Sequence, residues 1–366
     1  MTGEDSAGRR RRGPSMADVA RLAGVSGQTV SRVANERNNV DAATRDRVRA
    51  AMGQLGYRPN NAARALRNGE YRSIGVIVFE LHSFGTTRTL DAIATAATIS
   101  GYAINLVPVL DVTQSAVTSA FSRLGEQAVD GVIILIEAHT LDEAGVRLPH
   151  GLPVVVVDSS AHYDYPIVDT DQRQGARLAT EHLLNLGHAT VWHLGGPPTS
   201  FAADRRRQSW EQTLIDHGRE VPPVYEGDWT PGSGYEAGRK LAANAEVTAV
   251  FAANDQMALG LLRALHERGR AVPGDVSVVG FDDMEEAAHF WPPLTTIRQN
   301  FVDVGRLSVD ALILEIQAGE HHHEPVAVAA KLVHRSSTAP PPPSALGGST
   351  SEMWDGGGPG RGEGGA

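Results

Sequence analysis

The sequence predicts an α/β protein in which a small all-α head precedes a core of two parallel-sheet lobes. Residues 1–70 hold 13 arginines, no lysine and 7 acidic residues, a net charge of +6, while the whole chain carries −10, so the rest carries −16. A basic segment joined to an acidic body indicates a nucleic-acid-binding module attached to a second unit. From residue 73 onward, short apolar runs alternate with helix-length segments, a pattern typical of parallel sheets with helical crossovers.

Composition sets the class of protein. With 366 residues, 41% of them hydrophobic, the chain can build two or three compact units. It has no cysteine, which excludes disulfides, thiolate catalysis and cysteine-based metal sites. The charged N-terminal run is not followed by the apolar stretch of a signal peptide, and no apolar run is long enough to span a bilayer. We therefore expect a soluble, cytoplasmic protein.

Both ends of the chain are expected to be disordered. Residues 1–14 form a basic tail, and residues 339–366 are rich in proline and glycine, a composition that cannot build a core. A solubilising tail would account for the four arginines of residues 9–12. It leaves nine arginines of the head to be explained.

Three short helices are expected in the head. The first spans residues 16–24, and a glycine turn follows it. The second begins at Ser26, a residue suited to cap a helix, and runs to about Asn35. The third spans residues 44–55, where apolar residues recur at helical spacing.

The first two helices and their glycine turn describe a helix-turn-helix. Gln28 and Arg32 are four residues apart and project from the same face. Such side chains can bond adenine and guanine at two points each in the major groove. Ser26, Thr29 and Ser31 are natural phosphate contacts. An ordinary three-helix bundle with an arginine-rich surface is the alternative interpretation.

A second candidate DNA-binding element is YRPNNAARALR, residues 57–67. Asn60 is placed to cap a helix of about two turns, too short to be stable alone in water. Leu66, carried on a basic helix, could wedge between base steps from the minor groove. The candidate DNA-binding residues are therefore Ser26, Gln28, Thr29, Ser31, Arg32, Asn35, Tyr57, Asn60, Arg64 and Leu66.

Seven apolar runs are predicted as strands, four before the segment DTDQRQGARL and three after it. They are SIGVIV, AINLVPV, GVIILI, PVVVVD, TVWHLGG, TAVFAAN and VSVVGFDD. Two groups of strands predict two α/β lobes with a cleft between them. In such folds, ligands bind beyond the carboxyl ends of the strands.

The segments DVARLAGVSGQTVSRVAN and LGYRPNNAARALR resemble the head of the LacI/GalR family of bacterial transcription regulators. In the body, EHLLNLGH, EGDW, VFAANDQMALG, DVSVVGFDD and PPLTTIRQNF look most like the lactose repressor branch of that family. The resemblance covers roughly residues 15–338. It implies a DNA-binding domain (15–60), a hinge helix and linker (61–72), and a periplasmic-binding-protein-like core (73–338) for effector binding and dimerisation.

The same resemblance implies lobes of about 73–170 plus 300–326 and of about 171–299 plus 327–338. It also implies a homodimer whose two heads bind a near-palindromic operator in double-stranded DNA. Gly27 stands where the lactose repressor branch carries an aromatic reading residue, so the operator should differ. The tail after Arg335 lacks the apolar heptads that allow that branch to tetramerise, so we expect a dimer.

A sugar pocket needs planar groups that stack on the ring and paired donors and acceptors for the hydroxyls. Both kinds of residue occur near the predicted strand ends, and the resemblance implies that they line the effector site. The candidate effector-binding residues are Phe79, Phe84, Asp158, Arg206, Trp229, Asn254, Asp282 and Phe301. Each has a plainer interpretation: the aspartates could cap helices, Trp229 could be core, and Arg206 could be a solvated charge.

Together these expectations describe a repressor released from its operator by a small sugar, such as a galactoside or another mono- or disaccharide. A purine- or other metabolite-responsive corepressor-type regulator is the alternative. A transport receptor or a glycosidase fits less well, because neither needs a DNA-reading head. An enzyme is not expected, since the sequence has no G-x-S-x-G, glycine-rich phosphate loop or HExxH motif. We expect no cofactor and no metal, and residues 321–323, three histidines, lack metal-ligand spacing.

Overall fold

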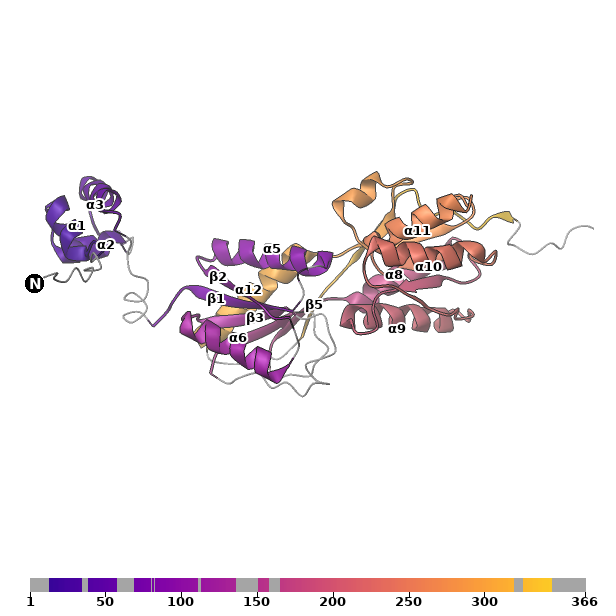
Figure 1. The fold of residues 1–366 in the computed structure, drawn as a ribbon, viewed down its shortest axis with the longest axis horizontal. Helices are drawn as coiled ribbons and strands as arrows, with labels where there is room; N and C mark the ends of the chain where they lie inside the picture. Colours follow the sequence, from indigo (N-terminus) through magenta and orange to yellow (C-terminus); the bar gives the residue numbers. More distant parts are fainter. Residues whose placement is uncertain are drawn as a thin grey trace, which may run out of the picture. The chain divides into compact units, whose positions relative to one another are not determined.

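The structure is a computed structural model. It describes residues 13–34, 39–57, 69–79, 81, 83–110, 113–135, 151–157, 165–318 and 325–343. The chain divides into two compact units, Met1–Tyr71 and Arg72–Ala366, both drawn in Figure 1. Several sequence predictions fall outside the described residues: Asn35, Asn60, Arg64, Leu66, Asp158, residues 321–323 and most of both tails.

In its described residues, the first unit holds three helices, α1 (Met16–Ala23), α2 (Gly27–Ala34) and α3 (Ala42–Leu55). Ser15 and Asp18 form a reciprocal capping box at the start of α1, which satisfies otherwise unpaired backbone donors. Gly24 follows with φ 65°, a left-handed conformation that suits glycine at the end of a helix. The Ser26 hydroxyl then accepts a hydrogen bond from the Thr29 amide at 3.1 Å, so the predicted cap is present.

A small apolar core holds these helices together. Val19, Val30 and Val48, one from each helix, are fully buried in it. Val33 is also buried, and Val25 packs against the cluster. The apolar underside predicted for α2 therefore faces this core, which leaves the opposite face of α2 free of core packing.

The first lobe of the second unit is built on a six-stranded sheet with the order β11-β5-β4-β3-β1-β2, and its described strand pairs are parallel. Its strands are β1 (Ser73–Val78), β2 (Ala103–Pro108), β3 (Gly131–Leu135), β4 (Val154–Val157), β5 (Ile167–Thr170) and β11 (Val326–Val328). Helices α5 (Phe84–Ile99) and α12 (Phe301–Ala318) pack on one face of the sheet, and α6 (Gln114–Glu126) packs on the other.

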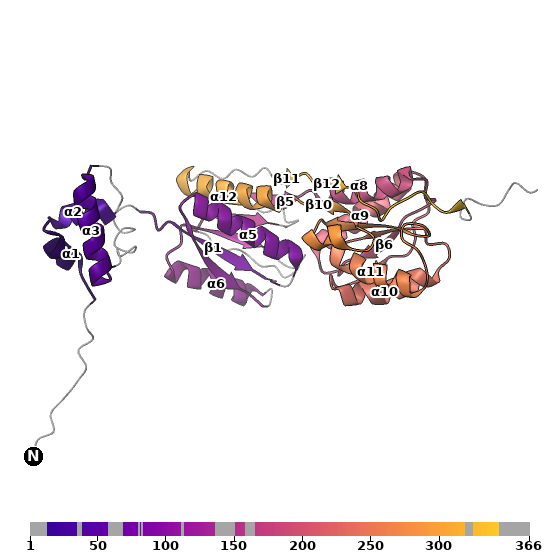
Figure 2. The same ribbon diagram turned by 90° about the horizontal axis from the view of Figure 1, so that it is seen from above.

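The second lobe repeats the plan with the strand order β12-β10-β9-β8-β6-β7. Its strands are β6 (Trp192–Gly195), β7 (Tyr225–Glu226), β8 (Ala249–Ala252), β9 (Ser277–Asp282), β10 (Thr295–Arg298) and β12 (Lys331–Val333), the last antiparallel to β10. Its helices are α8 (Gln172–Asn185), α9 (Phe201–Asp216), α10 (Pro231–Ala243), α11 (Asp255–Glu267) and the short 3-10 helix η1 (Glu285–His289). Figure 2 shows the two lobes side by side. This architecture confirms the predicted fold class.

The chain passes between the lobes at three places. It crosses from β5 into α8, from β10 into α12, and from β11 into β12. All seven apolar runs that the sequence analysis predicted as strands form strands. Strands β5, β7, β10, β11 and β12 were not predicted. After β12 the chain remains attached to the second lobe as far as Ala339, which pairs with the Ser277 hydroxyl through both its backbone groups.

Candidate functional site

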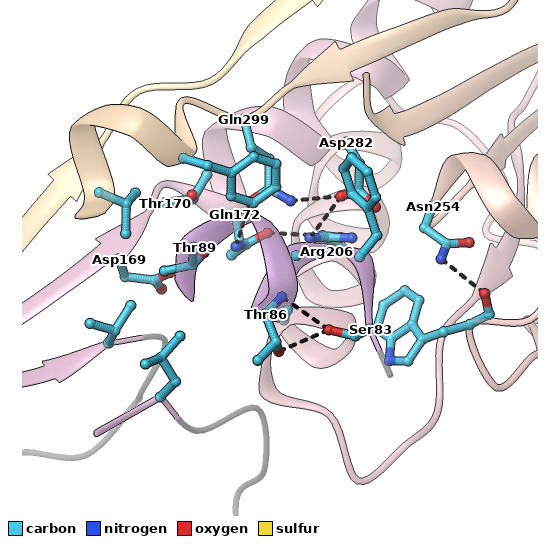
Figure 3. Close-up of a pocket in the computed structure, with 18 residues that line it drawn as sticks. Ser83, Thr86, Thr89, Asp169, Thr170, Gln172, Arg206, Asn254, Asp282 and Gln299 are labelled. Atoms are coloured by element: carbon cyan, nitrogen blue, oxygen red, sulfur yellow. Dashed lines mark hydrogen bonds and ion pairs between the residues drawn. The ribbon is translucent and has the colours of Figure 1, made fainter. Parts of the chain in front are cut away.

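A cavity lies between the two lobes, at the carboxyl ends of strands from both sheets. The space between its lining atoms, with the adjoining open solvent included, is about 610 Å³. The first lobe contributes the ends of β3 to β5 and the start of α5 and α12, and the second contributes α9 and the loops after β7, β8 and β9. Figure 3 shows these side chains converging from both lobes. This is the position expected for a ligand in an open parallel-sheet fold.

Six of the eight predicted effector-binding residues line this cavity: Phe84, Arg206, Trp229, Asn254, Asp282 and Phe301. Phe84 and Phe301 lie edge to face, with ring centroids 6.0 Å apart. Phe79 lies elsewhere, because it packs against the core cluster between the first sheet and α6. The remaining residue, Asp158, lies outside the described residues.

Arg206 is held in place on all sides. Its guanidinium lies 3.7 Å from the centroid of the Phe281 ring and 5.5 Å from that of Trp229. Nε donates to Gln172 Oε1 at 2.9 Å, and Nη1 donates to the Ala253 carbonyl at 2.6 Å. Nη2 lies 3.9 Å from Asp282 Oδ1. Stacking and bonding together fix the planar group, as expected for an arginine that recognises a ligand.

The two flanking arginines have other roles. Arg205 lies 4.6 Å over the Phe201 ring. Arg207 is 45% exposed in its side chain and pairs with Asp204 at 2.8 Å on the surface of α9. Arg206, by contrast, is 4% exposed. Of the three consecutive arginines, it is the one that the fold turns into the cavity.

The loops that carry Trp229 and Asp282 have unusual backbone geometry. Trp229 has φ 72° and Asp282 has φ 111°, conformations that non-glycine residues rarely adopt and that tend to occur at functional sites. The buried Asp255 supports the second loop, because its carboxylate accepts a hydrogen bond from the Met284 amide at 2.9 Å and one from Thr296 Oγ1 at 2.6 Å. The surrounding structure thus holds Asp282 toward the cavity.

Asn254 has a structural and a lining role at once. Its Oδ1 caps α11 by accepting the Met257 amide at 2.8 Å, and its Nδ2 donates to the Trp229 carbonyl at 3.1 Å. It therefore fixes the Trp229 loop relative to α11. A Cβ at Gly196 would overlap the Trp229 ring, so the tryptophan also needs a glycine beneath it.

Several polar cavity residues were missed by the sequence analysis. Gln172 lines the cavity just after the crossover from β5, and Gln299 lines it at the start of the crossover that follows β10; Asp169 and Thr170 end strand β5. Hydroxyls on and before α5 complete the polar lining: Ser83, Thr86 and Thr89. The signal that could have found Asp169 to Gln172 is their position directly after a short apolar run, Ile167-Val168, that was not recognised as a strand.

Asp169 has an unusual ionisation. Burial raises the pKa of its carboxyl to about 7, although a hydrogen bond from Gln172 and the charge of Arg206 act in the opposite direction. A raised pKa in the folded state means that the folded protein binds a proton that the unfolded chain releases. The stability that this proton contributes is present near pH 4 and is lost as the pH rises through 7.

We therefore expect Asp169→Asn to raise the melting temperature at pH 8 and to have little effect near pH 4.5, because asparagine stays neutral at both. Thermal melts across this pH range would measure the difference from the wild type. The exposed Asp91 on α5 provides the matched control, and Asp91→Asn should follow the wild-type profile. A pH-independent difference between Asp169→Asn and the wild type would show that the Asp169 carboxyl does not titrate in this window.

The first unit presents a separate candidate site on α2. Gln28 is exposed and Arg32 is partly exposed, on the side opposite the buried Val30 and Val33. The Ser26 and Thr29 hydroxyls lie 2.9 Å apart at the start of this helix. This is the arrangement of a helix whose polar face can enter the major groove of DNA.

The described residues meet the requirements of neither a metal site nor a membrane-spanning helix. No group of three or more histidine, aspartate or glutamate side chains there could hold a metal ion. None of the helices described is both long and apolar enough to cross a membrane.

Two family models match the chain. Residues 15–60 match the model of bacterial regulatory proteins, lacI family. Residues 180–338 match a periplasmic binding protein-like domain. The two matches fall on the helical unit and on the larger unit, respectively.

Individual relatives extend over most of the chain. The lactose operon repressor of Escherichia coli K12 is 37% identical over 305 residues, which cover 83% of this chain and 84% of that protein. The transcriptional repressor PurR of Haemophilus influenzae is 32% identical over 82% of this chain and 90% of its own length.

Solved structures show the same likeness. The lac repressor dimer bound to operator and the anti-inducer ONPF matches with a TM-score of 0.79 and 34% identity, over 90% of this chain and 100% of that one. The complex of the transcriptional regulator CelR with cellobiose matches with a TM-score of 0.64 and 32% identity, over 88% of this chain and 99% of that one.

Proposed function

Because the chain belongs to the LacI family of bacterial regulatory proteins, we propose that it is a cytoplasmic transcriptional repressor released from its operator by a small sugar. Its first unit binds DNA, and its second unit binds the effector. The observation that supports a sugar as the effector is the lining of the cavity, where aromatic rings, an arginine, an asparagine and an aspartate converge.

This lining suits a sugar because it offers two kinds of contact. Trp229, Phe84 and Phe301 present apolar surfaces to the C–H face of a ring. Arg206 and Asp282 present donors and acceptors in fixed positions, which vicinal hydroxyls can match in pairs. The complex of CelR with cellobiose supports a sugar. The transcriptional repressor PurR of Haemophilus influenzae is 32% identical to this chain, and a purine- or other metabolite-responsive corepressor-type regulator is kept as the second candidate.

A homodimer is the proposed DNA-binding form. The operator-bound lac repressor is a dimer, and two heads related by a twofold axis match a near-palindromic operator. The second lobe also exposes apolar side chains that a partner copy could cover, notably Trp291, 93% exposed, and Leu259, 42% exposed. Effector binding would lower operator affinity through a coupling free energy between the two sites.

A thermal-shift screen tests the proposed effector. Monosaccharides and disaccharides are compared with nucleobases, first on the wild type and then on Trp229→Ala. We expect a rise in melting temperature with one or a few sugars, and its loss in the variant. A rise with nucleobases alone would replace the sugar by a purine-type corepressor.

The predicted hinge remains a prediction, since residues 61–67 lie outside the described residues. We expect Leu66→Ser to weaken specific operator binding several-fold, because a wedge between base steps offsets the cost of unstacking them. Non-specific binding depends mainly on phosphate charge and should change little. Gel-shift titrations of operator and random DNA at one salt concentration measure both affinities. Equal weakening of both would assign Leu66 to packing.

A further inference from the structure

Four buried side chains form a closed ring in the wall of the cavity. Arg206 Nε donates to Gln172 Oε1 at 2.9 Å, and Gln172 Nε2 donates to Gln299 Oε1 at 3.3 Å. Gln299 Nε2 donates to Asp282 Oδ1 at 2.7 Å, and Asp282 closes the ring with Arg206 Nη2 at 3.9 Å. Figure 3 shows the four side chains facing one another. None is more than 7% exposed.

The two halves of the ring have different origins. Arg206 and Asp282 belong to the second lobe and are the charged residues to which the effector is assigned. Gln172 is the first residue of α8, directly after the crossover from β5, and Gln299 directly follows β10, where the chain returns to the first lobe. The ring therefore joins the ligand-binding charges to two of the three connections between the lobes.

The third connection is tied differently. Gln174 Nε2 donates to the Ala330 carbonyl at 3.2 Å, and the Ala330 amide donates to Gln174 Oε1 at 2.8 Å. Gln174 lies on α8 two residues after Gln172 but does not line the cavity. Gln174 thus holds the crossover between β11 and β12 without lining the proposed effector site.

We propose that Gln172 and Gln299 are positioning residues that transmit occupancy of Arg206 and Asp282 to the interlobe crossovers. This inference rests on the proposed effector site and adds to it the route by which that site acts. It assigns to the two amides no direct role in choosing the ligand.

The physical reason is that the ligand and the ring share the same two charged groups. A ligand hydroxyl that donates to the Asp282 carboxylate pulls on a group that already accepts from Gln299, and a hydroxyl that accepts from Arg206 pulls on a guanidinium that already donates to Gln172. A buried amide that loses its partner must find another, because an unpaired polar group in the interior is costly. A shift of Arg206 or Asp282 is therefore passed to Gln172 or Gln299, each of which lies at a crossover between the lobes.

The first test asks whether the ring is one unit, and it needs no ligand. Gln172→Met and Gln299→Met keep the length of each side chain and remove its hydrogen bonds. Because either change opens the ring, we expect the double variant to melt close to the less stable single variant. If the two losses in melting temperature add in the double variant, the two glutamines stabilise the protein independently, and the proposal of a single ring is wrong. Gln299→Asn provides a second ring-opening variant if Gln299→Met fails to fold.

The second test measures transmission, with the sugar identified by the thermal-shift screen. The quantity is the ratio of operator affinity without sugar to that with saturating sugar. General precedent places such ratios at about 5 to 150, and we expect the ratio to fall at least fivefold toward 1 in each ring variant. A structural role alone would lower the melting temperature without changing the ratio.

Two control variants separate this explanation from others. Gln174→Met releases the third crossover only, and Gln208→Met removes surface bonds on α9 to Arg173 and Asp204. Both should keep the wild-type ratio. An unchanged ratio in the ring variants, or an equal fall in Gln174→Met, would overturn the proposal. If no sugar changes operator affinity in the wild type, the proposed function fails. The comparison of the single and double glutamine variants without ligand still decides whether the four side chains act as one ring.

Discussion

An Arg206→Met variant is expected to bind operator DNA but to lose at least 100-fold in effector affinity. Among the described residues, Arg206 is the one buried guanidinium in the cavity lining, and its orientation is fixed by two aromatic rings and by bonds to Gln172 and Ala253. A hydrogen bond to a charged group contributes about 1.5–3 kcal/mol, and an arginine can offer two to a pair of hydroxyls. The loss of both corresponds to about 3 kcal/mol or more, which is over 100-fold.

The neighbouring arginines provide matched controls for this variant. Arg207→Met removes the same charge one residue away, from a side chain that pairs with Asp204 on the surface, and Arg205→Met removes a guanidinium that lies over Phe201. Calorimetric titration with the sugar should give wild-type affinity for both. Sugar affinity that falls equally in all three variants would show a general effect of charge on the lobe.

Stability must be measured alongside. Removing Arg206 leaves the Asp282 carboxylate, 7% exposed, without its cationic neighbour, and an uncompensated buried charge is destabilising. Arg206→Lys keeps the charge but loses the planar, bidentate geometry. We expect it to fold more stably than Arg206→Met and still to bind sugar weakly. Recovery of full affinity in Arg206→Lys would mean that charge alone is recognised.

Helical periodicity explains why Arg206, and neither Arg205 nor Arg207, lies on the buried face of α9. Positions 202, 203, 209, 210 and 213 on α9 are buried, and Arg206 shares their face because residues three and four apart lie together on a helix. The apolar character of Ala202, Ala203 and Trp210 is visible in the sequence. The pattern places Arg205 and Arg207 at the sides of the helix.

The same kind of argument explains Phe79. Side chains alternate between the faces of a strand, so Phe79, just after β1, continues the face of Ile77. That face packs on α6 with Val107 and Phe121, whereas Val76 and Val78 pack on the other cluster. Position at a strand end suggested a pocket residue, but the alternation within β1 directs it into the core.

Two of the strands that were not predicted, β5 and β10, share a physical cause. β10 reads TTIR and β5 reads IVDT, so neither shows the continuous apolar run of β1 or β4. They are recognised as strands only through pairing with β9 and β4, respectively, which are distant in sequence. Gln172 and Gln299 follow these two strands, and their place in the cavity was hidden for the same reason.

On the DNA-binding unit, Arg32→Ala is expected to reduce operator affinity by about 1–3 kcal/mol, roughly 5- to 150-fold, if the side chain bonds a guanine at two points. The helix should stay folded, because Arg32 lies outside the core formed by Val30 and Val33 and alanine is the best helix former. Effector affinity belongs to the other unit and should not change.

The comparison with Arg49→Ala decides between base reading and general charge. Arg49 is exposed on α3, so its loss removes one positive charge from the same unit without touching the polar face of α2. If Arg32 reads a base, Arg32→Ala weakens operator binding far more than binding to random DNA and relaxes the preference at one base pair. A phosphate contact would instead weaken both kinds of DNA together and lower the salt dependence of log affinity by about one unit. Gel-shift titrations on operator, single-base variants and random DNA over a range of salt separate the two outcomes, and equal weakening on every DNA would remove Arg32 from the base-reading set.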